Sequence, residues 1–293
     1  MKKYKENASF TKKSTAERIV YIVVFVLFFL YAASLLYPFL WGLLSSLKGV
    51  DEYLDSPFSL PSGWLFSNYA SAFEMLRYND ANFLQMIFNS IWFTAGGTLI
   101  AGIVVCMTAY VVAKYDFKGK GFIYALSLVI MVVPVVGALP AQYRLYNQLH
   151  LTDSPLLLIT YASGLGFNFI VMYGFFKSLP WGYAEAAFID GATHFQVFWK
   201  IMLPQASACI FAISIVNAIG MWNDYMIPML YLDHMPTLAS GLYSYQTIME
   251  MDTNCNYPVY FAGIFMSMLP MVVIYGAFHN VIMDNTATGG LKG

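Results

Sequence analysis

The sequence contains few charged residues. Asp, Glu, Lys and Arg make up 11% of the 293 residues, whereas hydrophobic residues make up 59%. Soluble globular domains carry about 25% charged residues, and a single soluble core could not absorb so much apolar surface. The low charge therefore excludes an ordinary soluble domain and predicts several membrane-spanning segments. No nucleic-acid partner is expected.

Cysteine is equally scarce. The three cysteines, Cys106, Cys209 and Cys255, have the spacing of neither a disulfide framework nor a metal site. The sequence also lacks a Gly-x-x-x-x-Gly-Lys-Ser/Thr phosphate loop, which excludes a P-loop NTPase. We therefore expect no metal site and no catalytic residue, and any ATP chemistry must belong to another polypeptide.

Six windows of the sequence lack Asp, Glu, Lys and Arg entirely. Each can hold the roughly 20 apolar residues needed to cross about 30 Å of hydrocarbon. A charge at mid-bilayer costs about 2.5–3.5 kcal/mol on insertion scales, so the windows mark membrane spans. The sequence thus predicts an all-α integral membrane protein with six transmembrane helices, at residues 19–42, 85–113, 121–142, 155–176, 205–230 and 258–282.

The basic residues orient these spans. Lys48, Arg77 and Arg144 fall on one side of the six spans, and every other Lys and Arg falls on the opposite side. Basic residues collect on the cytoplasmic side of a membrane, so both termini are predicted to be cytoplasmic. The predicted organisation is a cytoplasmic tail 1–18, a transmembrane domain 19–283 and a cytoplasmic tail 284–293. Within the domain, loop 177–204 is cytoplasmic, and loops 43–84 and 231–257 are external. The external loops are either solvated connectors or contacts with a soluble partner, and the second interpretation fits loop 231–257 best.

One polar stretch, residues 185–204, interrupts the apolar pattern between the fourth and fifth spans. Residues 181–190 favour a helix, and Gly191 allows a turn that a side chain would resist. Thr193 followed by Gln196 fits a capping box at the start of a second helix. The pattern predicts a helix, a hinge and a short helix, which form a compact knob. The knob either docks onto a partner in water or is an amphipathic connector on the membrane surface.

A family resemblance bears on this choice. Glu185-Ala186-Ala187, Asp190-Gly191-Ala192, and then Ile201 and Leu203-Pro204 resemble the EAA loop of permease subunits in binding-protein-dependent ABC importers. Segments 174–180, 222–225 and 289–293 are similar to the carbohydrate branch of that family, specifically its second, maltose-G-like permease. The resemblance covers nearly the whole chain and is weakest in loops 43–84 and 231–257.

The resemblance implies a type I ABC importer permease of the MetI-like kind, a multi-pass protein of the bacterial cytoplasmic membrane. It implies that the EAA loop is a coupling helix docked in a groove of a cytoplasmic ATPase subunit. ATP and Mg²⁺ would stay on two such ATPase subunits, so this chain would bind no cofactor and would not be an enzyme. The other implied partners are a second, homologous permease subunit in a heterodimer and an extracellular or periplasmic sugar-binding protein. The residues that would contact the ATPase are Glu185, Ala186, Ala187, Asp190, Gly191, Phe195, Leu203 and Pro204.

Polar residues inside the predicted spans are candidates for the substrate pathway. Sugars are bound by hydrogen-bonding side chains with an aromatic ring against their apolar face, although helix–helix hydrogen bonding explains such residues equally well. The candidates are Asn89, Asn168, Asn217, Trp222, Asn223, Asp224 and Tyr225. No basic cluster lies on the pathway side, which favours a di- or oligosaccharide over a phosphorylated cargo.

Two other classes of protein compete with this interpretation. A self-sufficient secondary transporter or channel predicts ion-coupling charges within the membrane, but only Asp224 qualifies, and the 185–204 segment would have no role. A membrane-embedded enzyme acting on lipid-linked sugar needs clustered catalytic groups. The acids at Asp116, Glu185, Asp190 and Asp284 are scattered and do not form such a motif.

Overall fold

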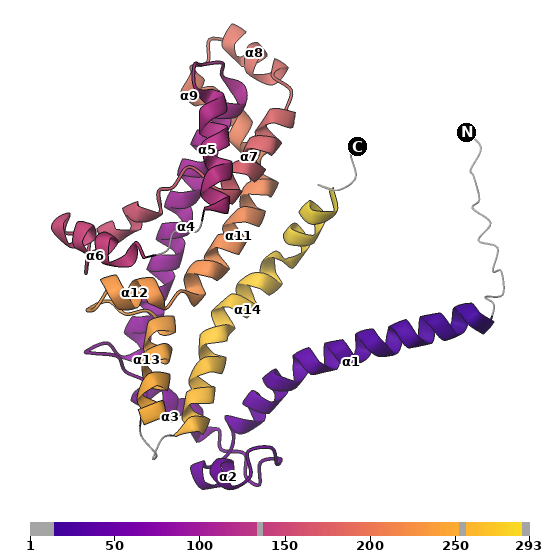
Figure 1. Ribbon diagram of the computed structural model, residues 1–293, viewed down its shortest axis with the longest axis vertical. Coiled ribbons are helices and arrows are strands. Elements are labelled where there is room, and N and C mark those ends of the chain that lie inside the picture. The colour runs from indigo at the N-terminus through magenta and orange to yellow at the C-terminus, as the bar shows by residue number, and fades with distance from the viewer. Residues whose placement is uncertain (1–14, 134–136, 252–255, 289–293) are drawn as a thin grey trace.

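The computed structural model describes residues 15–133, 137–251 and 256–288. Within these ranges every named element is a helix (Figure 1), apart from one isolated β-bridge between Tyr78 and Ala81. The all-α prediction is therefore confirmed. Three helices are long and apolar enough to cross a membrane: α1 (Thr15–Ser45), α4 (Phe83–Lys114) and α14 (Tyr257–Thr288). They coincide with the first, second and sixth predicted spans.

The third predicted span, 121–142, is wrong as a continuous helix. α5 (Lys120–Val132) has 13 residues, and the next helix in the described part of the chain is α6 (Leu139–Gln148). Val133 is extended, with ψ 112°, because the ring of a following proline, here Pro134, clashes with an α conformation in the preceding residue. The proline therefore ends the helix at Val132, whereas the absence of charged residues had predicted a helix that continues to residue 142.

The fourth predicted span, 155–176, is also broken. A 3-10 helix, η1 (Pro155–Tyr161), precedes α7 (Phe167–Ser178), which has 12 residues. Between them Gly166 adopts φ +104°, a conformation that glycine reaches without a steric penalty. Ser127 of α5 fixes this turn, since its hydroxyl accepts a hydrogen bond from Gly166 N at 2.8 Å.

The fifth predicted span, 205–230, ends earlier than expected. α11 (Ser207–Asn223) stops at Asp224, whose carboxylate accepts from the backbone N–H groups of Met226 and Ile227 at 3.0 and 3.1 Å and so starts α12 (Met226–Tyr231). At its other end α11 meets segment 194–205 at a bend of 77°, and this bent pair qualifies as a fourth span. α5 and α7 are shorter than a full crossing, so the six-span count and the placement of the termini remain predictions.

The two predicted external loops contain ordered helices. Loop 43–84 carries α2 (Val50–Asp55) and α3 (Ser67–Met75), and α13 (Leu238–Met251) occupies most of loop 231–257. Polar contacts tie the approach to α13 to distant segments. Asn79 Nδ2 donates to Asp233 Oδ1 at 2.8 Å, and His234 N donates to Asp153 Oδ1 at 2.8 Å. The segment that leads into α13 is therefore hydrogen-bonded to two segments that are distant in the sequence.

α4 is the central helix of the body and packs against α7 and α11. An apolar cluster lies at each of its ends. One joins Ala109 and Tyr110 of α4 to Phe176 of α7 and to residues between 184 and 206. The other joins Phe83 and Met86 of α4 to α3, α13 and α14. α1 stands away from this body along most of its length (Figure 1), and none of its most apolar 18-residue window is buried.

Candidate functional site

The segment 181–205, which we call the knob, has the predicted helix–hinge–helix form. α8 (Gly182–Ile189) is followed by α9 (His194–Val197), a π-helical turn η2 (Phe198–Met202) and α10 (Leu203–Gln205). The capping box is present as predicted. Gln196 N donates to Thr193 Oγ1 at 3.3 Å, and Thr193 N donates to Gln196 Oε1 at 2.8 Å. Two donors at the start of α9 are thereby satisfied.

Gly191 forms the hinge between α8 and α9. Its φ is +83°, which L-residues other than Asn and Asp rarely adopt. Gly191 N donates to Phe188 O at 3.0 Å, and Ala192 N donates to Ala187 O at 2.9 Å. These bonds satisfy carbonyls at the end of α8, as left-handed glycine caps do. The glycine therefore sets the angle between the two knob helices.

α8 has one face against the body and one face in solvent. Ala184 and Ala187 are buried in the apolar cluster at this end of α4, so Ala187 faces the interior of this chain. The contact of Ala187 with the ATPase stays a prediction. Glu185, Ala186, Asp190 and Gly191 are exposed, as is Phe195 of α9. Leu203 is half-buried and Pro204 is exposed.

The most exposed large apolar side chain of the knob is one that sequence reasoning missed. Ile189 is 87% exposed and lies at the end of α8 between Phe188 and Asp190. Phe195 is 64% exposed on α9. We call the exposed set Glu185, Ala186, Ile189 and Phe195 the knob face. An isoleucine directly before an acid at a helix end is the only sequence signal for its exposure.

The knob is fastened to the end of α4. Tyr115, the residue that ends α4, makes a hydrogen bond from its Oη to His194 Nδ1 at 2.8 Å. Lys114 Nζ donates to Leu179 O and lies 6.0 Å from the centre of the Trp181 ring. α4 therefore contacts the chain both before α8 and at the start of α9.

A polar cavity of about 400 Å³ lies between the η1–α7 break and α11. Asn168 Nδ2 donates to Asn217 Oδ1 at 3.0 Å across it. The cavity is also lined by Tyr161, Ser163 and Asp224. Tyr161 Oη is buried without a hydrogen-bond partner among the described residues, so one polar atom here is unsatisfied. Tyr161 and Ser163 were not among the sequence candidates, because the sequence did not predict the break between η1 and α7 that places them at the cavity.

The structure divides the seven pathway candidates. Asn168, Asn217 and Asp224 line the polar cavity, whereas four others do not. Asn89 Nδ2 donates to Pro236 O at 2.9 Å and is buried, and Asn223 Nδ2 donates to Ile219 O of its own helix at 2.8 Å. Tyr225 stacks on Tyr243 with ring centres 4.2 Å apart. Trp222 is buried toward α14, where its Nε1 donates to Ser267 O at 3.1 Å.

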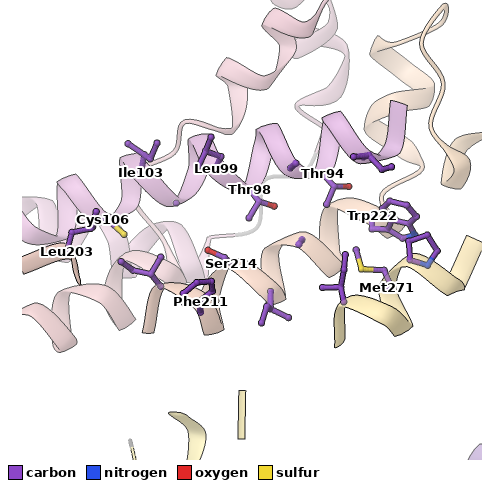
Figure 2. A pocket seen from close by; sticks show the side chains of 18 of the residues that line it. Thr94, Thr98, Leu99, Ile103, Cys106, Leu203, Phe211, Ser214, Trp222 and Met271 are labelled. Carbon is purple, nitrogen blue, oxygen red and sulfur yellow. The ribbon is translucent and has the colours of Figure 1, made fainter. Parts of the chain in front are cut away.

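Trp222 instead lines a second, apolar cavity of about 780 Å³ (Figure 2). α4 contributes Thr94, Thr98, Leu99, Ile103 and Cys106, α11 contributes Phe211 and Ser214, and α14 contributes Met271. Leu203 of the knob closes one end. The cavity thus runs along the face that α4, α11 and α14 share, from the N-terminal half of α4 to the knob.

Residues 99–282 match the family described as the binding-protein-dependent transport system inner membrane component. The chain belongs to this family. The permease is therefore a multi-pass protein of the bacterial cytoplasmic membrane, and a self-sufficient transporter or channel is not favoured.

Relatives of the permease cover almost its whole length. The diacetylchitobiose uptake system permease protein NgcG of Streptomyces coelicolor is 33% identical over 95% of this chain and 91% of its own. The arabinooligosaccharides transport system permease protein AraQ of Bacillus subtilis is 30% identical over 94% and 97%. The crystal structure of a bacterial ABC transporter involved in import of the acidic polysaccharide alginate aligns with a TM-score of 0.77 at 24% identity, covering 92% of this chain and 98% of that chain. The fold is that of a type I ABC importer permease.

The depth of the polar cavity in the permease follows from the helix that carries it. Asn168 lies ten residues before Ser178, the last residue of α7. At about 1.5 Å per residue this is about 15 Å, half of the roughly 30 Å hydrocarbon thickness. On the predicted placement of the α7–knob junction at the cytoplasmic surface, this distance would put Asn168 near the middle of the bilayer. Polar side chains at a helix break near mid-membrane are typical of transporter binding sites.

Proposed function

We propose that this permease moves a neutral di- or oligosaccharide into the cell by ATP-driven alternating access. The energy comes from two ATPase subunits on separate chains, and an external sugar-binding protein delivers the cargo. The knob face is the observation that carries this proposal. Ile189 at the end of α8 is 87% exposed and Phe195 on α9 is 64% exposed. On helices joined by a glycine hinge and a capping box, these side chains offer apolar anchors of the kind that dominate protein interfaces.

A second, homologous permease subunit would complete the membrane unit as a heterodimer. Two features support this part of the proposal. The apolar cavity along α4, α11 and α14 is open on one side of the body and large enough to receive side chains of another chain. α1 extends away from the body (Figure 1), and its apolar residues from Ile19 to Tyr31 are exposed within this chain. Both surfaces are apolar, as an interface between membrane helices requires.

The polar cavity is the proposed sugar-binding region of this subunit. Asn168, Asn217, Ser163 and Tyr161 supply donors and acceptors for sugar hydroxyls. Among the described residues that line the cavity, Asp224 is the only charged one and none is basic. An anionic cargo would leave its charge unpaired at this depth, which is costly. The lining therefore favours a neutral sugar, as in the diacetylchitobiose and arabinooligosaccharide uptake that the names of the two relatives state for those proteins.

We expect Glu185→Lys to abolish most transport while the protein still inserts in the membrane. Glu185 lies in the first turn of α8, where a carboxylate gains about 0.3–1 kcal/mol from the helix dipole. That amount is too small to unfold the knob, so a loss of uptake of tenfold or more would come from failed docking. The measurement is ATP-driven sugar uptake in vesicles, with ATPase retention on the purified permease as a second readout. Glu74→Lys, an exposed acid outside the knob, serves as the matched control and should retain wild-type uptake.

A substrate panel tests the cargo class separately. ATP hydrolysis by the reconstituted complex is measured with binding protein loaded with neutral oligosaccharides, an acidic oligosaccharide or a phosphorylated glycerol compound. We expect stimulation only by neutral oligosaccharides. Stimulation by the acidic or phosphorylated compound alone would overturn the neutral-sugar assignment, and a permease that never retains an ATPase subunit under gentle detergent would overturn the transport mechanism itself.

A further inference from the structure

α4 is joined by polar contacts to functional segments at both of its ends. At its C-terminal end, the capping residue Tyr115 contacts His194 Nδ1 of the knob, and Lys114 Nζ donates to Leu179 O just before the knob. Near its beginning, Asn89 and Ser90 hold the segment that leads into α13. Among the described helices, α4 also packs against both α7 and α11. Figure 1 shows α4 passing from the end of the body that carries α8 and α9 to the end that carries α13 and α3.

The contact with α13 is a buried helix cap supplied by another helix. Leu238 N, the first N–H of α13, donates to Ser90 Oγ at 2.8 Å, and Ser90 is 1% exposed. The first N–H groups of a helix have no partner within the helix, so Ser90 satisfies a donor that would otherwise be buried and unpaired. Leaving such a donor unsatisfied costs about 1–3 kcal/mol. α13 therefore cannot separate from α4 at this point without a substantial penalty.

Asn89 strengthens the same attachment. Its Nδ2 donates to Pro236 O at 2.9 Å, and its Oδ1 accepts from Trp92 Nε1 at 3.1 Å, which fixes the amide orientation. One turn earlier, Met86 lies where a side chain at Gly241 of α13 would be, since a Cβ there would be 2.3 Å from Met86 Sδ. The Met86 side chain of α4 thus packs directly on the backbone of α13, and a larger residue at position 241 would displace it.

We propose that α4 is the strut that couples the external helix α13 to the knob, and that Ser90 and Tyr115 are the positioning residues at its two ends. This inference rests on the proposed function, in which the knob docks onto an ATPase and the external side meets a binding protein. Ser90 and Tyr115 are 25 residues apart, or about 37 Å at about 1.5 Å per residue. A single α-helix fixed at both ends transmits a displacement of α13 to the knob as a rigid element.

The test is a double-mutant cycle in the complete complex of permease subunits, ATPase subunits and sugar-binding protein, reconstituted in nanodiscs. Ser90→Ala removes the acceptor of Leu238 N and leaves the hydrogen bonds between Thr237 and Ser240 at the start of α13 in place. Tyr115→Phe removes only the hydroxyl that contacts His194 while keeping the ring. The measured quantity is the stimulation of ATP hydrolysis by loaded binding protein, with basal hydrolysis and ATPase retention recorded separately. Ser34→Ala on α1, whose hydroxyl donates only to Tyr31 O of its own helix, is the matched control.

We expect each single variant to lower the stimulation of ATP hydrolysis at least threefold. The double variant should keep at least half of the stimulation of the more impaired single variant. Sites this far apart with no shared partner normally contribute independently, so a loss in the double variant equal to the product of the two single losses would overturn the strut. Unchanged stimulation in either single variant would also overturn it. If Ser90→Ala does not assemble, Asn89→Ala removes the neighbouring attachment and takes its place in the cycle. A wild-type complex without any retained ATPase would instead contradict the proposed function, and this inference with it.

Discussion

Gly191→Pro is expected to reduce ATP-driven sugar uptake to background. Gly191 adopts φ +83°, whereas proline fixes φ near −65°. Proline also removes the N–H that donates to Phe188 O at 3.0 Å. Both changes alter the angle between α8 and α9, so Ile189 and Phe195 would no longer lie in one docking surface. Uptake by vesicles and retention of the ATPase during purification are the two measurements.

Gly191→Asn separates hinge geometry from general damage. Asn is one of the few L-residues that adopt left-handed backbone conformations, so we expect this variant to keep uptake within about twofold of wild type. Gly191→Ala should fall between the two, because the left-handed conformation costs alanine about 1–2 kcal/mol. A Gly191→Pro permease that inserts and transports normally would show that the hinge has no role in coupling.

Asn217→Leu is expected to lower uptake about tenfold or more while leaving ATPase retention unchanged. The substitution removes the acceptor for Asn168 Nδ2, which now lies 3.0 Å from Asn217 Oδ1. It also replaces a group available to sugar hydroxyls by an apolar side chain. An unpaired amide costs about 1–3 kcal/mol when it is fully buried, and the half-buried Asn168 loses part of that; about 1.4 kcal/mol corresponds to a factor of ten. Initial rates at several sugar concentrations would show whether KM rises, as expected for lost binding.

Two further variants serve as controls for this prediction. Asn217→Asp keeps an oxygen that can accept from Asn168 Nδ2 and should recover part of the uptake. Asn223→Leu changes an exposed amide on the same helix that bonds only to Ile219 O and lies outside the polar cavity, so it should transport normally. If Asn223→Leu lost uptake and Asn217→Leu did not, the cavity between α7 and α11 would not be the sugar-binding region.

The absence of charge predicted which parts of the chain are apolar but not where the helices end. α1, α4 and α14 agree with predicted spans because nothing in their sequences interrupts a helix strongly enough. α5 ends at Val132 because Pro134 follows, and η1 and α7 separate at Gly166. Proline and glycine act through the local backbone, which a count of charged residues does not register. The broken helices created the polar cavity, so Tyr161 and Ser163 could not be named from the sequence.

For the knob, the sequence predicted the helices and the hinge but not which of their residues are exposed. Its hinge and its capping box were predicted from Gly191, Thr193 and Gln196, because these residues act on their immediate neighbours along the chain. Which alanine faces the body depends on packing against α4 and α7, which are distant in sequence. Ala187 is buried there, and Ile189 is exposed instead. Local rules therefore predicted the shape of the knob, whereas tertiary contacts decided which residues form its face.

Site-specific photo-crosslinking from position 189 tests the docking of the knob most directly. A benzophenone amino acid replaces Ile189 in the assembled complex, and a second variant carries it at Ile159, which is 56% exposed on η1, away from the knob. We expect position 189 to crosslink to an ATPase subunit, position 159 not to, and the crosslink at 189 to disappear with Gly191→Pro. Position 189 crosslinking to lipid alone, in a complex that still hydrolyses ATP in response to sugar, would contradict the docking of the knob and identify it as a connector on the membrane surface.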